Sequence, residues 1–461
     1  MDLEELSIEA ALASMRTGGT EETGGSRGTG ELTAVGLAEA MLARAAEVEP
    51  IVHAYVHLDP DLVRVQARAA DRRREEGVPP ALNGIPIGVK DLFETVDQPT
   101  TAGSRVRWRA GERYDAEAVR RLRAAGAVIH GKHWTHEFGC GLATPPTRYP
   151  WDLNRYPGGS SVGGGVSVAL GTSLAALGTD GAGSVRKPAA LNGLVGLKPT
   201  RGAVPLVGVV PGTTSLDHVG WITRTVADSR LLFETLARPG GTPQPGTRRR
   251  IGVPLNLLTY VEAGVASAFE DGLEALASAG VTVEYLDLPA LGEAQAAFGP
   301  IHAHETYRLH ARLLETSGSA YEPRTRESFA TGAGITAKEL AEARAARDRL
   351  AASVRSVMLD HGLDALASPT IPVGPRPLDE GDLGAALSEY SSLTMPFNVT
   401  GQPAITVPCG RDDRGFPVGI QLAGDWGAES TLFELGTWVE AMCPRPTGAY
   451  ARLVSEAGFR E

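Results

Sequence analysis

The sequence predicts an α/β fold, a single large α/β/α domain whose mixed central sheet is covered by helices on both faces. The chain has 461 residues, enough to bury a large core without disulfides or a structural metal. Segments with helical and strand periodicity alternate along it, which is typical of this fold class. We find no convincing linker between separate parts, so residues 1–461 are expected to form one domain.

The N-terminal third is predicted to be mostly helical. Apolar residues at helical spacing predict helices at 3–15, 32–48, 59–76 and 116–125. Residues 17–30 are rich in glycine and threonine and are expected to form a flexible loop. Short apolar runs at 85–89 and 128–131 predict buried strands, and the first of these ends at Lys90.

A glycine-rich region lies between Pro157 and Thr200. Apolar residues are interleaved throughout it, so it is not a linker, and its small residues indicate backbone packed closely around a site. Beyond it, helices alternate with strands. The predicted helices are 225–236, 265–278 and 337–360. The predicted strands are 251–254, 281–285, 405–408 and 418–422.

Composition and charge exclude several classes of function. A net charge of −11 argues against nucleic-acid partners and does not favour anionic membranes. Cys140, Cys409 and Cys443 are far apart, which indicates neither a disulfide framework nor a zinc site and fits a reducing compartment. The acidic first residues are not a secretory signal, and no apolar stretch is long enough to span a membrane. We therefore expect a cytoplasmic protein, and the sequence leaves a homodimer open.

Lys90 is the first candidate for chemistry. A lysine after an apolar strand is usually a surface charge, but one delivered into a closed core can act as a general base. That role requires a neutral amine, and so a pKa lowered from about 10.4 to roughly 7–8. Burial by the strand before Lys90 is the physical source of such a shift.

Two serine segments supply candidate nucleophiles. Ser184 follows Gly181, Ala182 and Gly183, whose backbone N–H groups can converge into an oxyanion hole. The alternative interpretation of Ser184 is an ordinary turn residue. The pair Ser160–Ser161 formally matches a nucleophile elbow, but Tyr-Pro-Gly-Gly before it breaks the strand that an elbow requires.

Several motifs together resemble the amidase signature family, over about residues 32–439, with the signature core at 84–230. They are Gly84-Ile-Pro-Ile-Gly-Val-Lys90-Asp, Thr100-Thr-Ala-Gly-Ser, Pro157-Gly-Gly-Ser-Ser, Gly178-Thr-Asp, Gly193-Leu-Val-Gly-Leu-Lys-Pro-Thr, Ser215-Leu-Asp-His-Val-Gly and Pro396-Phe-Asn-Val-Thr-Gly-Gln-Pro-Ala. The resemblance implies a Ser–Ser–Lys triad in which Ser184 is the nucleophile, Ser160 bridges from a cis peptide, and Lys90 is the base. It also implies an oxyanion hole made by the backbone of 181–184.

The same resemblance assigns the neighbouring residues. Asp180 and Arg186 are expected to be a supporting pair, and the loop containing Gly139, Cys140 and Gly141 to bound the acyl pocket, together with a helical region at 301–320. Departures from the family pattern include Ala182, Val162, Lys187 and the insertion at 17–30. Ala182 adds a methyl beside the oxyanion hole, and Lys187 stands where the amidotransferase member of the family carries glutamine.

The resulting expectation is an amidase that hydrolyses a small-molecule carboxamide to an acid and ammonia or an amine. No cofactor is expected. The pairs His53/His57 and His133/His136 have spacings that could suit a metal, but a metal site is disfavoured because no carboxylate-rich or cysteine-rich partner accompanies them. Two alternatives remain. One is the glutaminase-type A subunit of an amidotransferase complex, and the other is a catalytically silent binding homologue.

Overall fold

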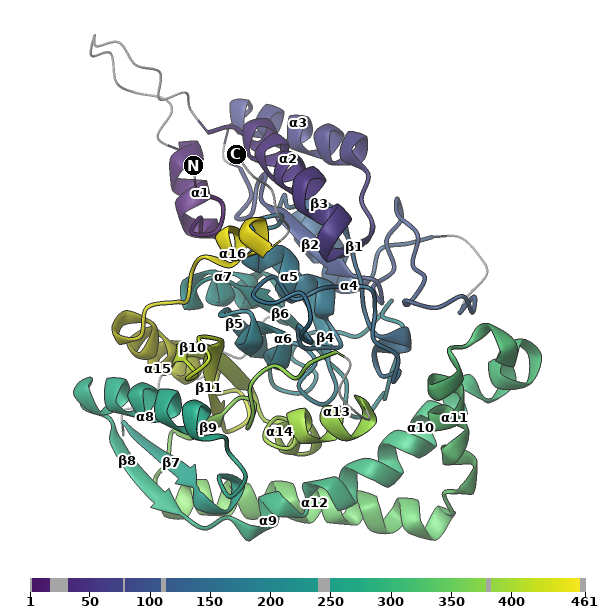
Figure 1. Ribbon diagram of the computed structural model, residues 1–461, viewed down its shortest axis with the longest axis vertical. Coiled ribbons are helices and arrows are strands. Elements are labelled where there is room, and N and C mark those ends of the chain that lie inside the picture. Colours follow the sequence, from purple (N-terminus) through teal and green to yellow (C-terminus); the bar gives the residue numbers. More distant parts are fainter. Residues whose placement is uncertain are drawn as a thin grey trace.

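The computed structural model describes residues 2–16, 32–77, 79–108, 113–238, 249–378 and 383–456, with the side chains of 383–385 excepted. The loop predicted at 17–30 lies outside the described residues. One mixed sheet of 11 strands runs through the described part of the chain, and helices flank it (Figure 1). The predicted fold class is thus confirmed, while the assignment of the whole chain to one domain stays a prediction.

The strands follow the order β1-β3-β2-β4-β6-β5-β10-β11-β9-β7-β8 across the sheet. Their bounds are β1 (Tyr55–His57), β2 (Pro86–Lys90), β3 (Val128–His133), β4 (Ala175–Asp180), β5 (Val195–Lys198), β6 (His218–Thr223), β7 (Arg250–Pro254), β8 (Thr282–Leu286), β9 (Ala365–Pro369), β10 (Ala404–Arg411) and β11 (Pro417–Gly424).

Strand direction places the Lys90 segment and the Ser184 segment at one edge of the sheet. β2 runs parallel to both of its neighbours, β3 and β4, with Val89 opposite Leu177. Parallel strands end at the same edge, so the end of β2 at Lys90 lies beside the end of β4 at Asp180. The connection after β4 contains Ser184, and the candidate site is therefore built at this edge.

Helices cover both faces of the sheet. Their bounds are α1 (Ile8–Arg16), α2 (Ala34–Val52), α3 (Pro60–Glu75), α4 (Glu117–Ala124), α5 (Val162–Ala169), α6 (Arg186–Leu191), α7 (Val226–Leu236), α8 (Ala263–Ser278), α9 (Pro289–Gly292), α10 (Ala294–Ser317), α11 (Pro323–Ala330), α12 (Ala337–Asp360), α13 (Leu383–Ser391), α14 (Pro396–Thr400), α15 (Glu429–Met442) and α16 (Ala449–Glu456).

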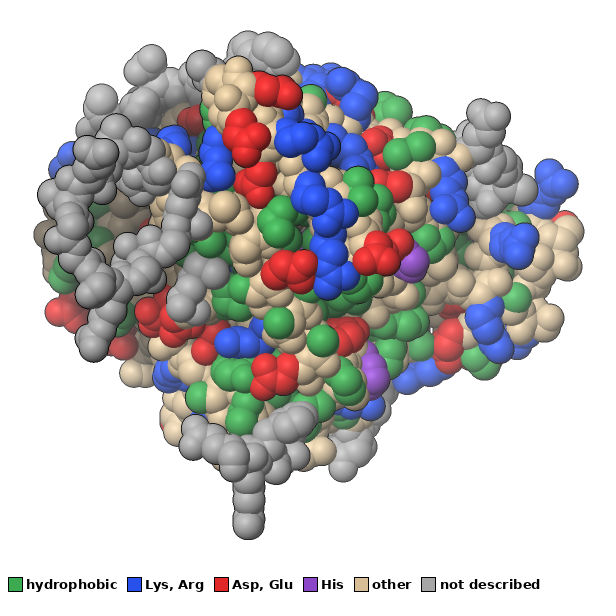
Figure 2. Space-filling model, turned by 90° about the horizontal axis from the view of Figure 1, so that it is seen from above, with side chains coloured by type: hydrophobic (Ala, Val, Ile, Leu, Met, Phe, Trp, Pro, Cys, Tyr) green, Lys and Arg blue, Asp and Glu red, His purple; other side chains and the backbone are tan. Residues whose placement is uncertain are grey.

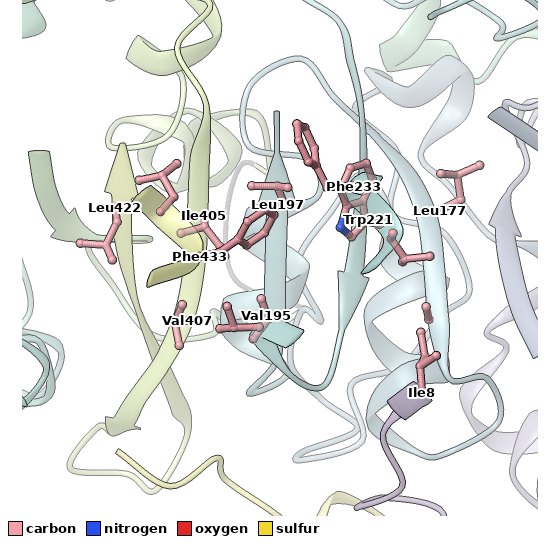
Figure 3. Close-up of a cluster of buried hydrophobic side chains, with 14 of the residues drawn as sticks. Ile8, Leu177, Val195, Leu197, Trp221, Phe233, Ile405, Val407, Leu422 and Phe433 are labelled. Atoms are coloured by element: carbon pink, nitrogen blue, oxygen red, sulfur yellow. The ribbon is translucent and has the colours of Figure 1, made fainter. Parts of the chain in front are cut away.

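Successive residues of the central strands pack into different cores. Leu177 and Trp221 belong to the larger core, which α4, α7, α8 and α15 help to form. Their neighbours Ala176 and Ile222 belong to the core on the other face, with residues of α5 and α6. Figure 3 shows side chains of the larger core, from strands and helices, gathered around the sheet. A strand buried on both faces reads as a largely apolar run, as residues 85–89 do.

Two long helices, α10 and α12, pack together as an arm at one end of the molecule, with α11 near its tip (Figure 1). Side chains of α10 hold the loop before β6. The Nδ1 atom of His302 lies 2.6 Å from Oγ1 of Thr213, and Glu305 accepts hydrogen bonds from Thr214 and the backbone N–H of Ser215. These contacts bring α10 to the edge where β2 and β4 end.

Most predicted helices lie within a few residues of the observed ones, and the helix at 337–360 matches α12. The helix predicted at 3–15 begins only at Ile8, because the carboxylate of Asp228 accepts the N–H groups of Ile8 and Glu9 and caps it there. The glycine-rich region also contains α5, which was not predicted. A Cβ at Gly163 would lie 2.0 Å from the carbonyl oxygen of Ala54, so glycine permits this helix to pack closely.

Acidic and basic side chains are interspersed on the face that Figure 2 shows, with hydrophobic side chains between them. No helix within the described ranges is both long and apolar enough to cross a membrane.

Candidate active site

Lys90 is buried at the end of β2, with 1% of its surface exposed. Its Nζ atom donates hydrogen bonds to Oγ of Ser160 at 2.8 Å and to Oγ1 of Thr179 at 2.9 Å. Burial lowers the pKa of Lys90 from 10.5 to about 7, although the negative charges of Asp217 and Asp180 oppose the shift. The amine is therefore poised between its charged and neutral forms near neutral pH, as a general base requires.

Ser160 lies in the turn before α5, and the peptide bond between Gly159 and Ser160 is cis. The surroundings leave no room for a side chain at Gly159. A Cβ there would lie 2.3 Å from the hydroxyl oxygen of Tyr156 and 2.7 Å from Nε2 of His136. The backbone N–H of His136 donates to the carbonyl oxygen of Ser160 at 3.3 Å. Tyr156 and His136 thus pack closely against the backbone at Gly159 and Ser160.

His136 is neutral and fixed by two hydrogen bonds. Its Nδ1 atom lies 2.9 Å from the carbonyl oxygen of Gly141, and its Nε2 atom lies 2.8 Å from the hydroxyl of Tyr156. Since a carbonyl only accepts, Nδ1 carries the proton and Tyr156 donates to Nε2. Burial lowers the pKa of His136 to about 4. Sequence reasoning considered this histidine only for a metal.

Ser184 is half-buried in the turn between β4 and α6, and its carbonyl oxygen accepts the N–H of Ser161 at 3.1 Å. This bond ties the two serine segments together. Ser184 and Ser160 line the same pocket. Ser161 is 2% exposed, and its hydroxyl donates to the carbonyl oxygen of Thr179 at 3.5 Å. Ser184 therefore lines the pocket, whereas the Ser161 side chain is buried outside its lining.

The N–H groups of the turn differ in whether they have a hydrogen-bond partner. The N–H of Gly183 donates to Oδ1 of Asp180 at 2.7 Å, so it is not an open donor. In the described residues, the N–H groups of Gly181, Ala182 and Ser184 have no hydrogen-bond partner. The oxyanion hole at 181–184 stays a prediction, and Asp180 already binds one of its four N–H groups.

Asp180 and Arg186 form a fully buried ion pair, with Nη2 and Oδ1 2.9 Å apart. Arg186 also donates to the side chains of Asn398 and Gln421. Burial alone would raise the pKa of Asp180, but the Arg186 charge and its hydrogen bonds hold that pKa well below its usual range. Asp180 thus stays ionised and orients the turn that carries Ser184.

The pocket has a volume of about 280 Å³. Gly139, Cys140 and Gly141 line it, and the predicted helical region contributes His302, preceded on α10 by Gln295 and Phe298. Burial raises the pKa of the Cys140 thiol, which keeps it protonated. Ala182 also lines this pocket and packs against a neighbouring hydrophobic core.

Two charged residues of the pocket were not predicted as site residues. Lys187, which the sequence marked only as a departure, lines the pocket from α6, and Asp217 lines it from the loop before β6. Asp217 accepts the N–H groups of Gly212 and Thr213 at 2.9 and 2.8 Å. Its Oδ1 atom would lie 2.7 Å from a Cβ at Gly181, so it sits beside the turn that carries Ser184. Burial raises the pKa of Asp217 to about 6.

No group of three or more His, Cys, Asp or Glu side chains within the described ranges is arranged to hold a metal ion. His130 and His133 are fully buried beside Tyr55, and burial lowers the pKa of His130 to about 4. Both histidines therefore belong to the packed interior and stay neutral.

Comparison with known proteins identifies relatives across nearly the whole chain. The Amidase family model matches residues 36–433. The chain is 36% identical to the A subunit of glutamyl-tRNA(Gln) amidotransferase from Chloroflexus aggregans, over 88% of this chain and 92% of the relative. A crystal structure of an amidase superposes with a TM-score of 0.85 at 34% identity, covering 95% of this chain and 100% of that one. Peptide amidase from Stenotrophomonas maltophilia superposes with a TM-score of 0.81 at 28% identity, covering 96% and 98%.

Proposed function

The chain belongs to the amidase family, and we propose that it hydrolyses a small-molecule carboxamide to a carboxylic acid and ammonia or an amine. The observation that carries this proposal is the hydrogen bond of 2.8 Å between the buried Lys90 amine and Ser160. A lysine with a pKa of about 7 is a base at neutral pH, and a serine within its reach can pass a proton to it.

In the first half of the proposed reaction, Oγ of Ser184 attacks the carbonyl carbon of the amide. Its proton passes to Ser160, whose own proton passes to the lone pair of neutral Lys90. Lys90 can donate to Thr179 with one N–H while its lone pair accepts from Ser160. The products of this step are a tetrahedral oxyanion and a protonated Lys90.

The oxyanion is proposed to bind the open N–H groups of Gly181, Ala182 and Ser184. One such donor is worth roughly 3–4 kcal/mol in comparable sites. When the carbon–nitrogen bond breaks, Ser160 gives its proton to the leaving amine and is reprotonated by Lys90. Water then loses a proton through the same relay and attacks the acyl carbon, and the relay returns that proton to Oγ of Ser184 as the acid is released.

Ser184→Ala tests this proposal directly. A fluorophosphonate should label the Ser184 peptide of the wild type, and the variant should lose both labelling and amide hydrolysis. Ser161→Ala is the matched control, because Ser161 is buried and bonded to Thr179. Labelling that persists in Ser184→Ala, or that maps to Ser161, contradicts the assignment of the nucleophile.

A second function is favoured by the 36% identity to the A subunit of an amidotransferase. A protein of this second kind would release ammonia from glutamine for use within a complex. The assay compares glutamine with aryl and alkyl amides, with and without candidate partner proteins. If glutamine is the only amide that is hydrolysed, and only when partner proteins are present, the amidotransferase function is established. A chain that binds amides but turns over none would be a silent homologue.

A further inference from the structure

Lys187 is a buried amine in the active-site pocket that has no acidic partner among the described residues. It is the second residue of α6, three positions after Ser184, and 5% of its surface is exposed. Its Nζ atom donates to Oγ of Ser391 at 2.7 Å. Within the described ranges, no carboxylate oxygen lies within the 4.0 Å that defines an ion pair with it. Burying an ammonium group without a counter-ion costs free energy, and a bound anion would offset this cost.

The charge of Lys187 acts inside the pocket. Burial lowers the pKa of Lys187 to about 8, with the charge of Asp180 opposing the shift. Its own positive charge in turn lowers the pKa values of Lys90 and His136. The ammonium group therefore lies within electrostatic reach of the proposed base. An anion beside Lys187 would offset the cost of burying this charge.

Among the described residues that line the pocket, Asp217 is the one acidic side chain. Asp180 and Arg186 influence the pKa of Lys187, whereas Asp217 has no resolved effect on it. Lys187 instead faces α13, from which the uncharged residues Leu387, Ser388 and Ser391 line the pocket. An anionic ligand group is repelled by Asp217 and attracted by Lys187, so its place is at the α13 side.

We propose that Lys187 binds a carboxylate on the substrate, so that the enzyme acts on carboxamides that also carry an anionic group. This inference rests on the proposed amidase function. The anion would hold the substrate at the α13 side of the pocket while its amide carbonyl lies at the oxyanion hole. Lys187 is then a specificity-determining residue, and the proton still passes through Ser160 to Lys90.

The test compares matched substrates in matched variants. Glutaramate and succinamate carry a carboxylate, and pentanamide and butanamide are neutral amides of the same chain lengths. For the wild type, we expect kcat/KM for the anionic amides to exceed that for the neutral ones by roughly 10- to 100-fold. In Lys187→Met this ratio should fall to about one. Lys338→Met should keep the ratio, because Lys338 is an exposed lysine, its side chain 83% accessible.

A binding measurement separates this inference from the amidase function itself. Glutarate, which has no amide, should raise the melting temperature of the wild type and bind at least about 10-fold more weakly to Lys187→Met. Ser184-dependent hydrolysis without a preference for anionic amides, or a preference that survives in Lys187→Met, overturns the inference and leaves the amidase function standing. Glutarate binding that depends on Lys187, without turnover of any amide, rejects the amidase function instead. If no amide is turned over and glutarate does not bind, both are rejected.

Discussion

The Nζ atom of Lys90 lies 2.8 Å from Oγ of Ser160, although 70 residues separate them in the chain. Lys90 ends β2, whose neighbour β4 leads into the turn of Ser184. Ser160 precedes α5, which packs against β4. The parallel pairing of β2 and β4 is therefore what brings the amine to the two serine segments.

The rate of amide hydrolysis should rise with pH through a limb with an apparent pKa near 7. Burial lowers the pKa of Lys90 to about 7, and only the neutral amine can accept the serine proton, so activity is lost below that pH. Lys90→Met should lose roughly 100- to 10,000-fold in kcat. Lys90→Arg should be equally inactive, because arginine stays protonated. An active arginine variant would mean that Lys90 serves only as a positive charge.

Lys187→Met and Asp217→Asn should move this limb in opposite directions. The Lys187 charge lowers the pKa of Lys90, and the Asp217 charge raises it. Removing Lys187 should therefore shift the acid limb of kcat/KM to higher pH, and removing the Asp217 charge should shift it to lower pH. The profiles are measured with a neutral amide, so that substrate charge does not contribute. Shifts of the same sign in both variants would contradict this electrostatic arrangement.

Arg186→Met should destabilise the fold by about 3–5 kcal/mol, because it leaves the buried Asp180 carboxylate without its cation. Unfolding in guanidinium chloride, followed by circular dichroism, measures this loss. Arg250→Met is the matched control. Arg250 pairs with Glu284 at the surface, at 45% and 28% side-chain exposure, and such pairs contribute only about 0–1 kcal/mol. Equal losses in the two variants would show that the buried Asp180–Arg186 pair contributes no more to the free energy of unfolding than a surface pair.

Gly183→Ala should lower kcat while leaving the rest of the fold intact. Gly183 has a φ of +99°, and a Cβ there would lie 2.2 Å from Oγ1 of Thr394. The turn must shift to relieve this contact, which displaces Ser184 and the open N–H groups beside it. Gly292→Ala is the control, because no atom lies within 4 Å of a Cβ at that position. A Gly183→Ala enzyme with wild-type kcat would mean that the turn tolerates displacement.

Much of the site could be predicted from local sequence. The apolar run before Lys90 left a surface charge and a buried amine open, and the small residues before Ser184 indicated a turn whose N–H groups can converge. Periodicity also located α12, and the structure shows that a capping box of Thr336 and Glu339 begins this helix. The order of the motifs pointed to the amidase family, to which the chain belongs.

The sequence by itself determined which residue types stand at the ends of β2 and β4, because strand burial and turn chemistry depend on neighbouring residues. Only the tertiary structure decided which groups share one pocket. Asp217 and Lys187 reach it from the loop before β6 and from α6, and the Asp180 carboxylate accepts the N–H of Gly183 in the turn before Ser184. The pKa of Lys90 likewise depends on charges contributed by several segments. Such effects arise from distances between segments far apart in the chain, which no local pattern encodes.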